Sequence, residues 1–260
     1  PLPVRGARVP LLDGAALATA CHLVPAMAQG LPLQLAEAPD ATLAASLPGL
    51  VEVLARFDPR LRPIRVEHPA PAADPTPPAA GVGLFFTGGV DSFHHLLAHG
   101  DGIDALVHVL GFDQPDEPGP LRDATLAMLE AVAAETGRRL IVVSTTLRTY
   151  LDANVPWGTS HGAALAAVVH ALRGELGTLH VPSSLAGDEQ VAWGSHPDLD
   201  ARWSSATTRI VHGTVALDRR EKTRAIAASP LALRHLRVCW ENRDGAYNCG
   251  RCAKCLRTML

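Results

Sequence analysis

From residue 81 onward, short apolar runs alternate with longer segments whose apolar residues recur at helical spacing. We expect these elements in order: strand 82–86, helix 91–99, strand 105–110, helix 121–136, strand 139–143, helix 162–172 and strand 179–181. Strands that alternate with helices form parallel sheets through right-handed crossover connections. The pattern therefore predicts an α/β fold with a doubly wound parallel sheet, in which ligands bind beyond the carboxyl ends of the strands.

Residues 1–68 predict a smaller α/β region in front of this sheet. Its expected elements are a helix at 15–23 that closes at Gly30, an edge strand at 31–35, a helix at 41–57 capped by Asp40, and a strand at 63–67. Prolines are dense in residues 69–80, which favours an extended, semi-rigid linker. We therefore predict three parts, namely the N-terminal region 1–68, the linker 69–80 and a main domain 81–260.

Composition narrows the class of protein. The 260-residue chain is 47% hydrophobic, which is enough for a large α/β domain with an appendage. The chain has 23 Lys and Arg residues and 26 Asp and Glu residues, so its overall charge does not favour nucleic-acid binding. Only a local basic patch would provide a nucleic-acid surface. No run of about 18 apolar residues is present, so we expect no membrane span. The first residues lack the charged-then-apolar order of a signal peptide, so a cytoplasmic protein is expected.

Most of the cysteines gather near the end of the chain, where Cys239, Cys249, Cys252 and Cys255 are separated by nine, two and two residues. Such clustering favours a metal site in a reducing compartment over disulfides. Four soft thiolates suit tetrahedral zinc in a closed structural site. An iron–sulfur cluster is the alternative, although the C-x-x-x-C-P continuation of bacterial ferredoxins is missing. We therefore predict a structural zinc site within residues 239–255.

The first strand of the main domain ends at two glycines, in the stretch Thr-Gly-Gly-Val-Asp-Ser at residues 87–92. Glycine lets the backbone turn tightly, and the N-terminus of the helix that follows offers free N–H groups to an anion. The stretch lacks the Gly-Lys-Ser/Thr of a Walker A loop and the Gly-x-Gly-x-x-Gly of a dinucleotide fold. It predicts a phosphate-binding loop. The alternative is an ordinary glycine turn between a strand and a helix.

Residues 87–92 resemble the S-G-G-x-D-S signature of the PP-loop ATP pyrophosphatases, with Thr87 in place of the first Ser. Together with the cysteine cluster, they make the chain similar to the 7-cyano-7-deazaguanine synthase family over roughly residues 81–260. That family has a Lys-containing helix, then a Cys after a short strand, then C-G-x-C-x-x-C followed by Arg. The corresponding segments here are 219–226, 238–240 and 248–257. The resemblance implies a HUP-like fold that ends in a zinc knuckle.

The resemblance also implies an ATP-dependent ligase that binds ATP with Mg²⁺ and a structural Zn²⁺. Enzymes of the family adenylate 7-carboxy-7-deazaguanine, release pyrophosphate, and use ammonia to form an amide and then a nitrile. The residues implied in ATP binding are Phe86, Thr87, Gly88, Gly89, Val90, Asp91, Ser92 and Phe112, and those implied in catalysis are Asp91, Ser92 and Lys222.

Two of these residues have a specific expected role. Lys222 would neutralise charge on the α-phosphate, and Asp91 would orient Mg²⁺ or the loop. The strand-end rings Phe86 and Phe112 would border the adenine. The alternatives are a surface lysine paired with Glu221, a plain helix cap at Asp91, and aromatic rings that belong to the core.

Two segments depart from the family pattern. The family's V-P-x-R-N is V-P-W-G-T-S-H at 155–161, and its Y-P-D-C-R is H-P-D-L-D-A-R at 196–202. The candidate substrate-binding residues are Asp113, Asp188, His196, Asp198 and Arg202, and each is equally compatible with an ordinary loop residue. Residues 1–80 have no counterpart in the family. We interpret the chain as a divergent paralogue whose acceptor is open; paralogues of this kind occur in antiphage gene clusters.

Two other functions stay open. A tRNA-modifying PP-loop protein, such as a thiolating enzyme, would usually have a basic RNA-binding face and an unligated catalytic cysteine, and the near-neutral charge disfavours it. A non-catalytic nucleotide-binding or scaffold module would use the N-terminal region to bind a protein. A homodimer, a protein partner or a protein-borne acceptor is compatible with the same region. Nucleic-acid and membrane partners are not expected.

Overall fold

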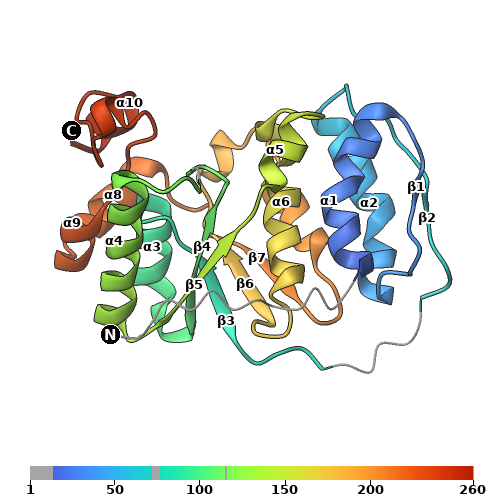
Figure 1. The fold of residues 1–260 in the computed structure, drawn as a ribbon, viewed down its shortest axis with the longest axis horizontal. Helices are drawn as coiled ribbons and strands as arrows, with labels where there is room; N and C mark the ends of the chain where they lie inside the picture. Colours follow the sequence, from blue (N-terminus) through green and yellow to red (C-terminus); the bar gives the residue numbers. More distant parts are fainter. Residues whose placement is uncertain (1–13, 72–76, 115, 260) are drawn as a thin grey trace.

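The structure, a computed structural model, describes residues 14–71, 77–114 and 116–259. At its centre is a parallel sheet of five strands in the order β5-β4-β3-β6-β7 (Figure 1). The strands are β3 (Val82–Phe85), β4 (Ala105–Leu110), β5 (Arg139–Ser144), β6 (Thr178–Val181) and β7 (Arg209–His212). The α/β fold with a parallel sheet is confirmed, and so are the four strands predicted for it.

Strand β7 is the one that the sequence pattern does not predict. Its two apolar residues, Ile210 and Val211, form too short a run to stand out from the polar residues around them. The strand lies at the edge of the sheet and pairs with β6 from Thr178↔Arg209 to Val181↔His212. This register places His212 at the carboxyl edge of the sheet, level with the end of β6.

The strand order reverses at β3, because β4 and β5 lie on one side of it and β6 and β7 on the other. Across this switch, the register pairs Val82 with Thr178 and Leu84 with His180. In doubly wound sheets, ligands bind in the crevice outside the carboxyl ends of the strands that flank such a switch. The loops that follow β3 and β6 are therefore the expected place for a ligand.

Helices cover both faces of the sheet (Figure 1). One face carries α3 (Val90–His99), α4 (Pro120–Thr136), α8 (Arg219–Ala227) and α9 (Pro230–His235). The other carries α1 (Gly14–Gln29), α2 (Ala41–Phe57), α5 (Leu147–Asp152) and α6 (Trp157–Ala171), while α7 (Pro197–Asp200) and α10 (Ala253–Met259) lie in later loops. Because successive strand side chains point to opposite faces, Leu84 and Phe86 join the core under α3 and α4, whereas Phe85 joins the core of α1, α2 and α6. Among the helices of the described residues, none is long and apolar enough to cross a membrane.

The predicted helices are present, with one clear difference at α6. This helix begins at Trp157 rather than at Gly162, directly after Pro156, whose missing N–H is harmless at a helix start. Two glycines in the first half of α6 interrupt the spacing of apolar residues from which a helix is predicted. A Cβ at Gly158 would lie 3.1 Å from the ring of Trp193, and a Cβ at Gly162 would clash with the neighbouring 194–195 backbone. The loop before α7 therefore packs closely on this half of α6.

The N-terminal region shares a hydrophobic core with the sheet. Strands β1 (Leu33–Gln34) and β2 (Val66–Glu67) pair in parallel and are shorter than the predicted strands. Helix α2 has its predicted bounds, with Asp40 Oδ1 accepting from the Leu43 N–H at 3.0 Å. Helix α1 lies along α6, and its Leu23 has no exposed surface. Residues on both sides of the predicted linker thus pack into the same core. Residues 72–76 of that linker lie outside the described residues.

His170, in the last turn of α6, is a buried histidine with few polar contacts. It is 4% exposed, its Nδ1 lies 3.2 Å from Thr208 Oγ1, and its Nε2 has no hydrogen-bond partner among the described residues. Burial disfavours the charged imidazolium and lowers the pKa of His170 from 6.5 to about 4. Protonation of this side chain therefore competes with folding in mildly acidic solution.

We predict that the free energy of unfolding falls when the pH is lowered from 7 to 5. In this range the unfolded chain binds a proton at His170, near its ordinary pKa of 6.5, whereas the folded chain does not until its pKa of about 4. Urea unfolding at the two pH values should show a loss on the order of 2 kcal/mol from this residue alone. His170→Asn should lessen the pH dependence, and His22→Asn, at an exposed position of α1, should not. Equal pH dependence in all three proteins would refute the prediction.

Candidate functional site

The glycine turn after β3 lies at the switch point of the sheet. Gly88 has a φ of +75°, a left-handed conformation that residues with a Cβ rarely adopt. A Cβ here would also lie 2.5 Å from Cε of Met128 in α4. Gly89 is the N-cap of α3. Because glycine has no side chain, no side-chain acceptor caps the first N–H groups of the helix. The arrangement suits an anion at the N-terminus of α3.

The two hydroxyl side chains of the turn differ in exposure. Thr87 is exposed at the start of the turn. Ser92 is 4% exposed, and its hydroxyl donates to the carbonyl oxygen of Gly89 at 3.0 Å. The Thr87 hydroxyl is thus accessible to a ligand in this structure, whereas Ser92 stabilises the first turn of α3.

The apolar residues predicted to contact ATP belong largely to the core. Phe86 and Val90 have no exposed surface, and the Phe86 ring packs edge-on against Phe93 with centroids 5.0 Å apart. Phe112 is buried and packs against Trp157 with ring centroids 5.0 Å apart. The Phe86 ring therefore presents no open face to adenine, and Phe112 supports a tryptophan that reaches the cavity described below.

Helix α8 brings two cations to the glycine turn. Its N-cap Asp218 accepts from the Glu221 N–H at 2.7 Å, and Glu221 accepts from the Asp218 N–H at 2.7 Å. This capping box fixes where the helix begins. Arg219 and Lys222 are three positions apart, so they lie on one face of α8, towards α3. Glu221 is thus engaged in the cap rather than paired with Lys222.

Lys222, Arg219 and Asp91 form an ionic cluster beside the turn. Lys222 is 1% exposed; its Nζ donates to the Ser183 carbonyl at 2.8 Å and lies 3.8 Å from Asp91 Oδ1. Asp91 Oδ2 accepts from Arg219 Nη1 at 2.9 Å. Burial raises the pKa of Asp91 and lowers the pKa of Lys222, in each case against the attraction of the opposite charge. The cluster links α3, α8 and the loop after β6.

This ionic cluster has unused hydrogen-bonding capacity. An ammonium group can donate three hydrogen bonds, and within the described residues Lys222 Nζ donates one. Asp91 lies in the first turn of α3 rather than at its N-cap, and its Oδ1 is buried without a hydrogen-bond partner among the described residues. The positive end of the α3 dipole and the two cations of α8 lie together, so an anion is stabilised here.

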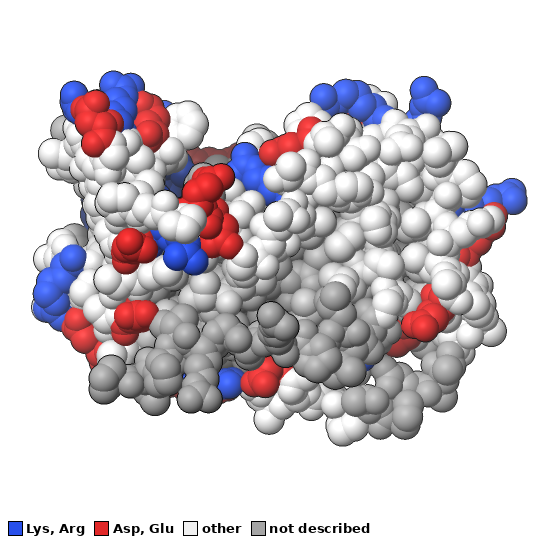
Figure 2. All heavy atoms as spheres, viewed as in Figure 1, with Lys and Arg blue, Asp and Glu red and all other residues white. Residues whose placement is uncertain are grey.

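A cavity of about 520 Å³ lies beside the cluster, at the carboxyl ends of β6 and β7. Ser183, whose carbonyl accepts from Lys222, contributes to its lining. Trp157 and His161 of α6 line another side, and Trp193 faces His161 with ring centroids 5.5 Å apart. Figure 2 shows the surface hollowed between the C-terminal segment that carries α10 and the helices α5 and α6. The cavity combines aromatic surface with a neighbouring cationic cluster.

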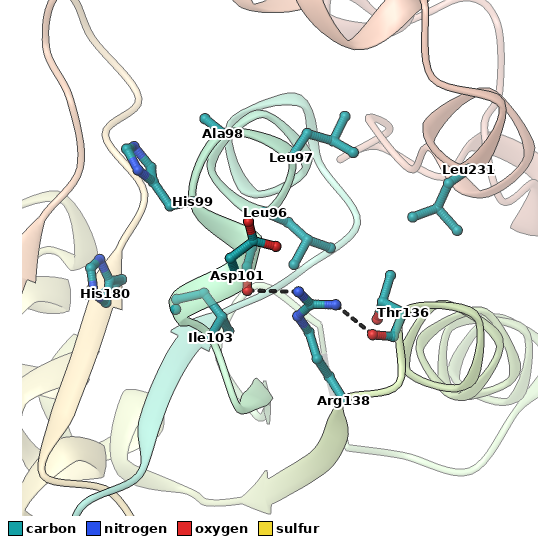
Figure 3. A pocket seen from close by; sticks show the side chains of 12 residues that line it. Leu96, Leu97, Ala98, His99, Asp101, Ile103, Thr136, Arg138, His180 and Leu231 are labelled. Carbon is teal, nitrogen blue, oxygen red and sulfur yellow. Dashed lines mark hydrogen bonds between the residues drawn. The ribbon is translucent and has the colours of Figure 1, made fainter.

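A second cavity, of about 540 Å³, lies at the amino ends of the strands (Figure 3). It is bordered by the end of α3 and by Arg138, which precedes β5. The Arg138 guanidinium donates to the carbonyls of Thr136 at 2.5 Å and Gly100 at 2.6 Å, and so joins two connecting loops. Because this cavity lies away from the glycine turn, we take the first cavity as the candidate site.

Two of the predicted substrate-binding residues lie in loops near the carboxyl edge of the sheet, and one of them reaches the cavity. Asp113, which follows β4, lines the cavity, and its carboxylate is 3.8 Å from Arg148 Nη1. Asp188 lies in the short 3-10 turn Gly187–Glu189 and is exposed, outside the cavity lining.

The other three predicted substrate-binding residues face α2 instead of the cavity. The His196 ring packs edge-on against Phe57 with centroids 4.7 Å apart, and its Nδ1 accepts from the Asp198 N–H at 3.0 Å. Asp198 forms an ion pair with Arg56 at 3.1 Å. Arg202 Nε donates to the Asp198 carbonyl at 2.9 Å. The structure does not bring these side chains to the ligand site; it uses them to hold α7 against the N-terminal region.

Sequence reasoning missed most residues that line the cavity. Trp157 and His161 lie four positions apart, which places both on one face of a helix, and this spacing could have found them once α6 was known to begin at Trp157. His212 is the last residue of β7, a strand too short to be predicted, so its place at the cavity could not be predicted either. Lys254 lies between two cysteines of the cluster, a position that by itself indicates no ligand contact.

The predicted metal ligands Cys239, Cys249, Cys252 and Cys255 are positioned to bind a metal ion. Their sulfur atoms all lie within 4.8 Å of one another, and those of Cys239 and Cys252 are 3.8 Å apart. Sulfurs bound tetrahedrally at about 2.3 Å from one ion would be about 3.8 Å apart. Asn248 Oδ1 accepts from the N–H groups of Val238 at 3.0 Å and Cys239 at 3.2 Å, which fixes the first ligand beside the others.

The cysteine cluster is joined to the candidate site in two places. The Arg237 N–H, two residues before Cys239, donates to the carbonyl of Gly88 at 2.7 Å. Lys254, next to Cys255, lines the cavity. A metal ion held by the cysteines would therefore fix the backbone that supports the glycine turn and also a cation at the edge of the cavity.

Comparison with protein-family models gives no match to this chain, and comparison with curated proteins gives no significant one. The similarity of residues 87–92 and of the cysteine spacing to the PP-loop pyrophosphatases therefore stays an interpretation.

Gly88→Ala should destabilise the protein by about 2 kcal/mol or more. A Cβ in the left-handed conformation costs about 1–2 kcal/mol, and here it would also displace Met128. The matched control is Gly102→Ala, because Gly102 has no atom within 4 Å of an added Cβ. Urea unfolding of both variants measures the difference. Equal stability of the two would show that the turn is not the tight one described.

Proposed function

We propose that the chain is an ATP-dependent carbon–nitrogen ligase of the PP-loop type. It activates a carboxylate as its adenylate, releases pyrophosphate, and transfers the acyl group to an amine. The observation that carries this proposal is the place of the glycine turn, at the switch point of a parallel sheet and beside the buried Lys222 and the partly exposed Arg219. This geometry favours a polyphosphate ligand, and the resemblance of residues 87–92 favours cleavage between the α- and β-phosphates.

In this proposal the N-terminus of α3 binds the β- and γ-phosphates. The N–H groups of the glycine turn donate to phosphate oxygens, and the exposed Thr87 hydroxyl and a reoriented Ser92 hydroxyl add to them. Lys222 uses its free donors to stabilise the charge that develops on the α-phosphate. Mg²⁺ would be held by Asp91, whose Oδ1 has no hydrogen-bond partner among the described residues, and by phosphate oxygens. When bound, it neutralises charge on the departing pyrophosphate.

The cavity beside Ser183 is the place for the acid that is activated. Trp157 and Trp193 provide flat aromatic surface, and Lys254 provides a cation for a carboxylate. These features suit a planar aromatic acid. 7-Carboxy-7-deazaguanine is such an acid and is the first compound to test, with related planar acids as the alternative.

The thiolating alternative is disfavoured by the cysteines. Cys21, the one cysteine outside the cluster, lies in α1, where burial raises the pKa of its thiol to about 11. A thiol with this pKa supplies little thiolate at neutral pH, and thiolate is the reactive form. Figure 2 also shows acidic and basic side chains interspersed on the face that it views, where an RNA-binding surface would be basic.

We further propose that the ion at the cysteines is structural zinc. Metal analysis of the purified protein should give about one zinc per chain without visible absorption, since zinc has a filled d shell. Cys249→Ser should lose the metal and weaken ATP binding, because Arg237 is then no longer held against Gly88. The control is Cys21→Ser, which should keep the zinc. Iron with visible absorption would replace the zinc assignment with an iron–sulfur cluster.

The activity itself is tested by AMP and pyrophosphate formation from ATP with 7-carboxy-7-deazaguanine and ammonia. Ser92→Ala should slow turnover by about 10²-fold, because one hydrogen-bond donor to the transferred phosphates is lost. Ser46→Ala is a matched control, since the Ser46 hydroxyl also donates to a helix carbonyl, at 3.2 Å, but in the distant α2. AMP formation only with a different acid would reject 7-cyano-7-deazaguanine synthase activity but support the proposed adenylation of a carboxylate. Tight ATP binding without turnover for any acid would favour a scaffold.

A further inference from the structure

A buried carboxylate and a histidine form a pair at the wall of the cavity. Asp200, the last residue of α7, is 2% exposed. Its Oδ2 accepts from the Ser195 hydroxyl at 2.8 Å and lies 2.7 Å from His212 Nδ1, and its Oδ1 accepts from the His196 N–H at 3.3 Å. These contacts fix both the carboxylate and the imidazole ring that faces it.

The contacts also determine which nitrogen of His212 carries the proton. A carboxylate only accepts hydrogen bonds, so Nδ1 of His212 carries a proton, and in the neutral imidazole Nε2 has a free lone pair. Nε2 is buried and has no hydrogen-bond partner among the described residues, while the ring lines the cavity. A buried acceptor without a donor is costly, and a donor on a ligand in the cavity would satisfy it.

The other polar groups beside the pair are already engaged. His161 Nε2 accepts from the Ser195 N–H at 3.2 Å, and its Nδ1 lies 3.1 Å from the Trp157 carbonyl, to which it donates. The Ser195 hydroxyl donates to Asp200 rather than to His212, so the three residues do not form a serine-hydrolase triad. The chemistry that the pair can perform is therefore proton transfer, through His212 Nε2.

The pair lies close to the proposed phosphate site. The N–H of Gly213, which follows His212, donates to the Val181 carbonyl at 2.7 Å. Two residues after Val181, the Ser183 carbonyl accepts from Lys222. Only the short segment from Val181 to Ser183 thus separates the cation that would stabilise the α-phosphate from the histidine that faces the cavity.

We propose that His212 is the general base of the transfer step and that Asp200 is its positioning residue, an inference that rests on the proposed function. The amine forms the new C–N bond with the acyl carbon, and the C–O bond to the phosphate of AMP breaks, with its electron pair leaving on AMP. The proton that the attacking nitrogen must lose moves to His212 Nε2. Asp200 then stabilises the imidazolium.

The test separates adenylation from transfer, with 7-carboxy-7-deazaguanine as the acid and ammonium as the amine source. ATP–pyrophosphate exchange measures adenylation without amine, and amide formation measures the whole reaction. His212→Asn keeps an N–H donor towards Asp200 but removes the basic Nε2 nitrogen. We expect its exchange to stay close to the wild-type rate and its transfer to be slower by about 10²–10⁴-fold. Asp200→Asn should also slow transfer more than exchange, and the exposed His22→Asn should change neither.

The pH dependence provides a readout that a structural role would not change. At a fixed concentration of free ammonia, transfer by the wild-type protein should decline in acid, as expected of a step that uses a general base, and His212→Asn should lose this decline. Asp200 and His196 at the two ends of α7, His161 of α6, Asp113 after β4 and Lys254 of α10 are the other titratable groups near it, and all are retained in the variant.

Each outcome decides between the two proposals. Unimpaired transfer in His212→Asn overturns the inference, and so do equal losses of exchange and transfer, which would indicate a structural role. His212→Gln serves as the second variant where the asparagine protein does not fold. Absence of exchange in the wild-type chain, with this acid and with related planar acids, overturns the proposed function and the inference with it.

Discussion

The burial of one lysine fixes the geometry of the candidate site. An ammonium group removed from water needs nearby acceptors, or its charge becomes strongly destabilising. For Lys222 they come from two elements, the Ser183 carbonyl after β6 and Asp91 in the first turn of α3. A shift of α8 relative to the sheet would remove both at once. The loops on the two sides of the switch point are therefore held at a fixed separation, in the crevice where this class of fold binds its ligands.

The cysteine cluster extends this constraint to the glycine turn. Glycine has few conformational restrictions of its own, so neighbouring residues have to fix the turn at Gly88. The Arg237 N–H does so from the chain that leads into Cys239. Lys254, inside the cluster, faces the cavity. A metal ion bound by these cysteines, next to the proposed ligand site rather than within it, would give rigidity to both features without entering the proposed chemistry.

The sequence predicted correctly those parts of the fold that depend on neighbouring residues in the chain. All six residues of β4 are buried, and α2 has a clear cap at Asp40, so both have their predicted bounds. The glycine turn is equally local. The partners of Lys222 are not, because Ser183 is 39 residues away and meets it only through packing of α8. The H-P-D segment at 196–198 was misleading for the same reason: Phe57 and Arg56 contact it from a region that no local signal connects to it.

The arrangement of charge around the cavity bears on how one site could perform both half-reactions. Adenylation needs cations beside the phosphates, and acyl transfer needs an acceptor for a proton. If Lys222 and Asp200 were in contact, they would form an ion pair and neither would act on a ligand. The end of β6 and the residues that follow it lie between them: Lys222 contacts the Ser183 carbonyl, while Asp200 holds His212 on the neighbouring strand. This segment keeps the two charges apart, so Lys222 retains free donors beside the glycine turn, and His212, which lines the cavity, retains an Nε2 without a hydrogen-bond partner among the described residues.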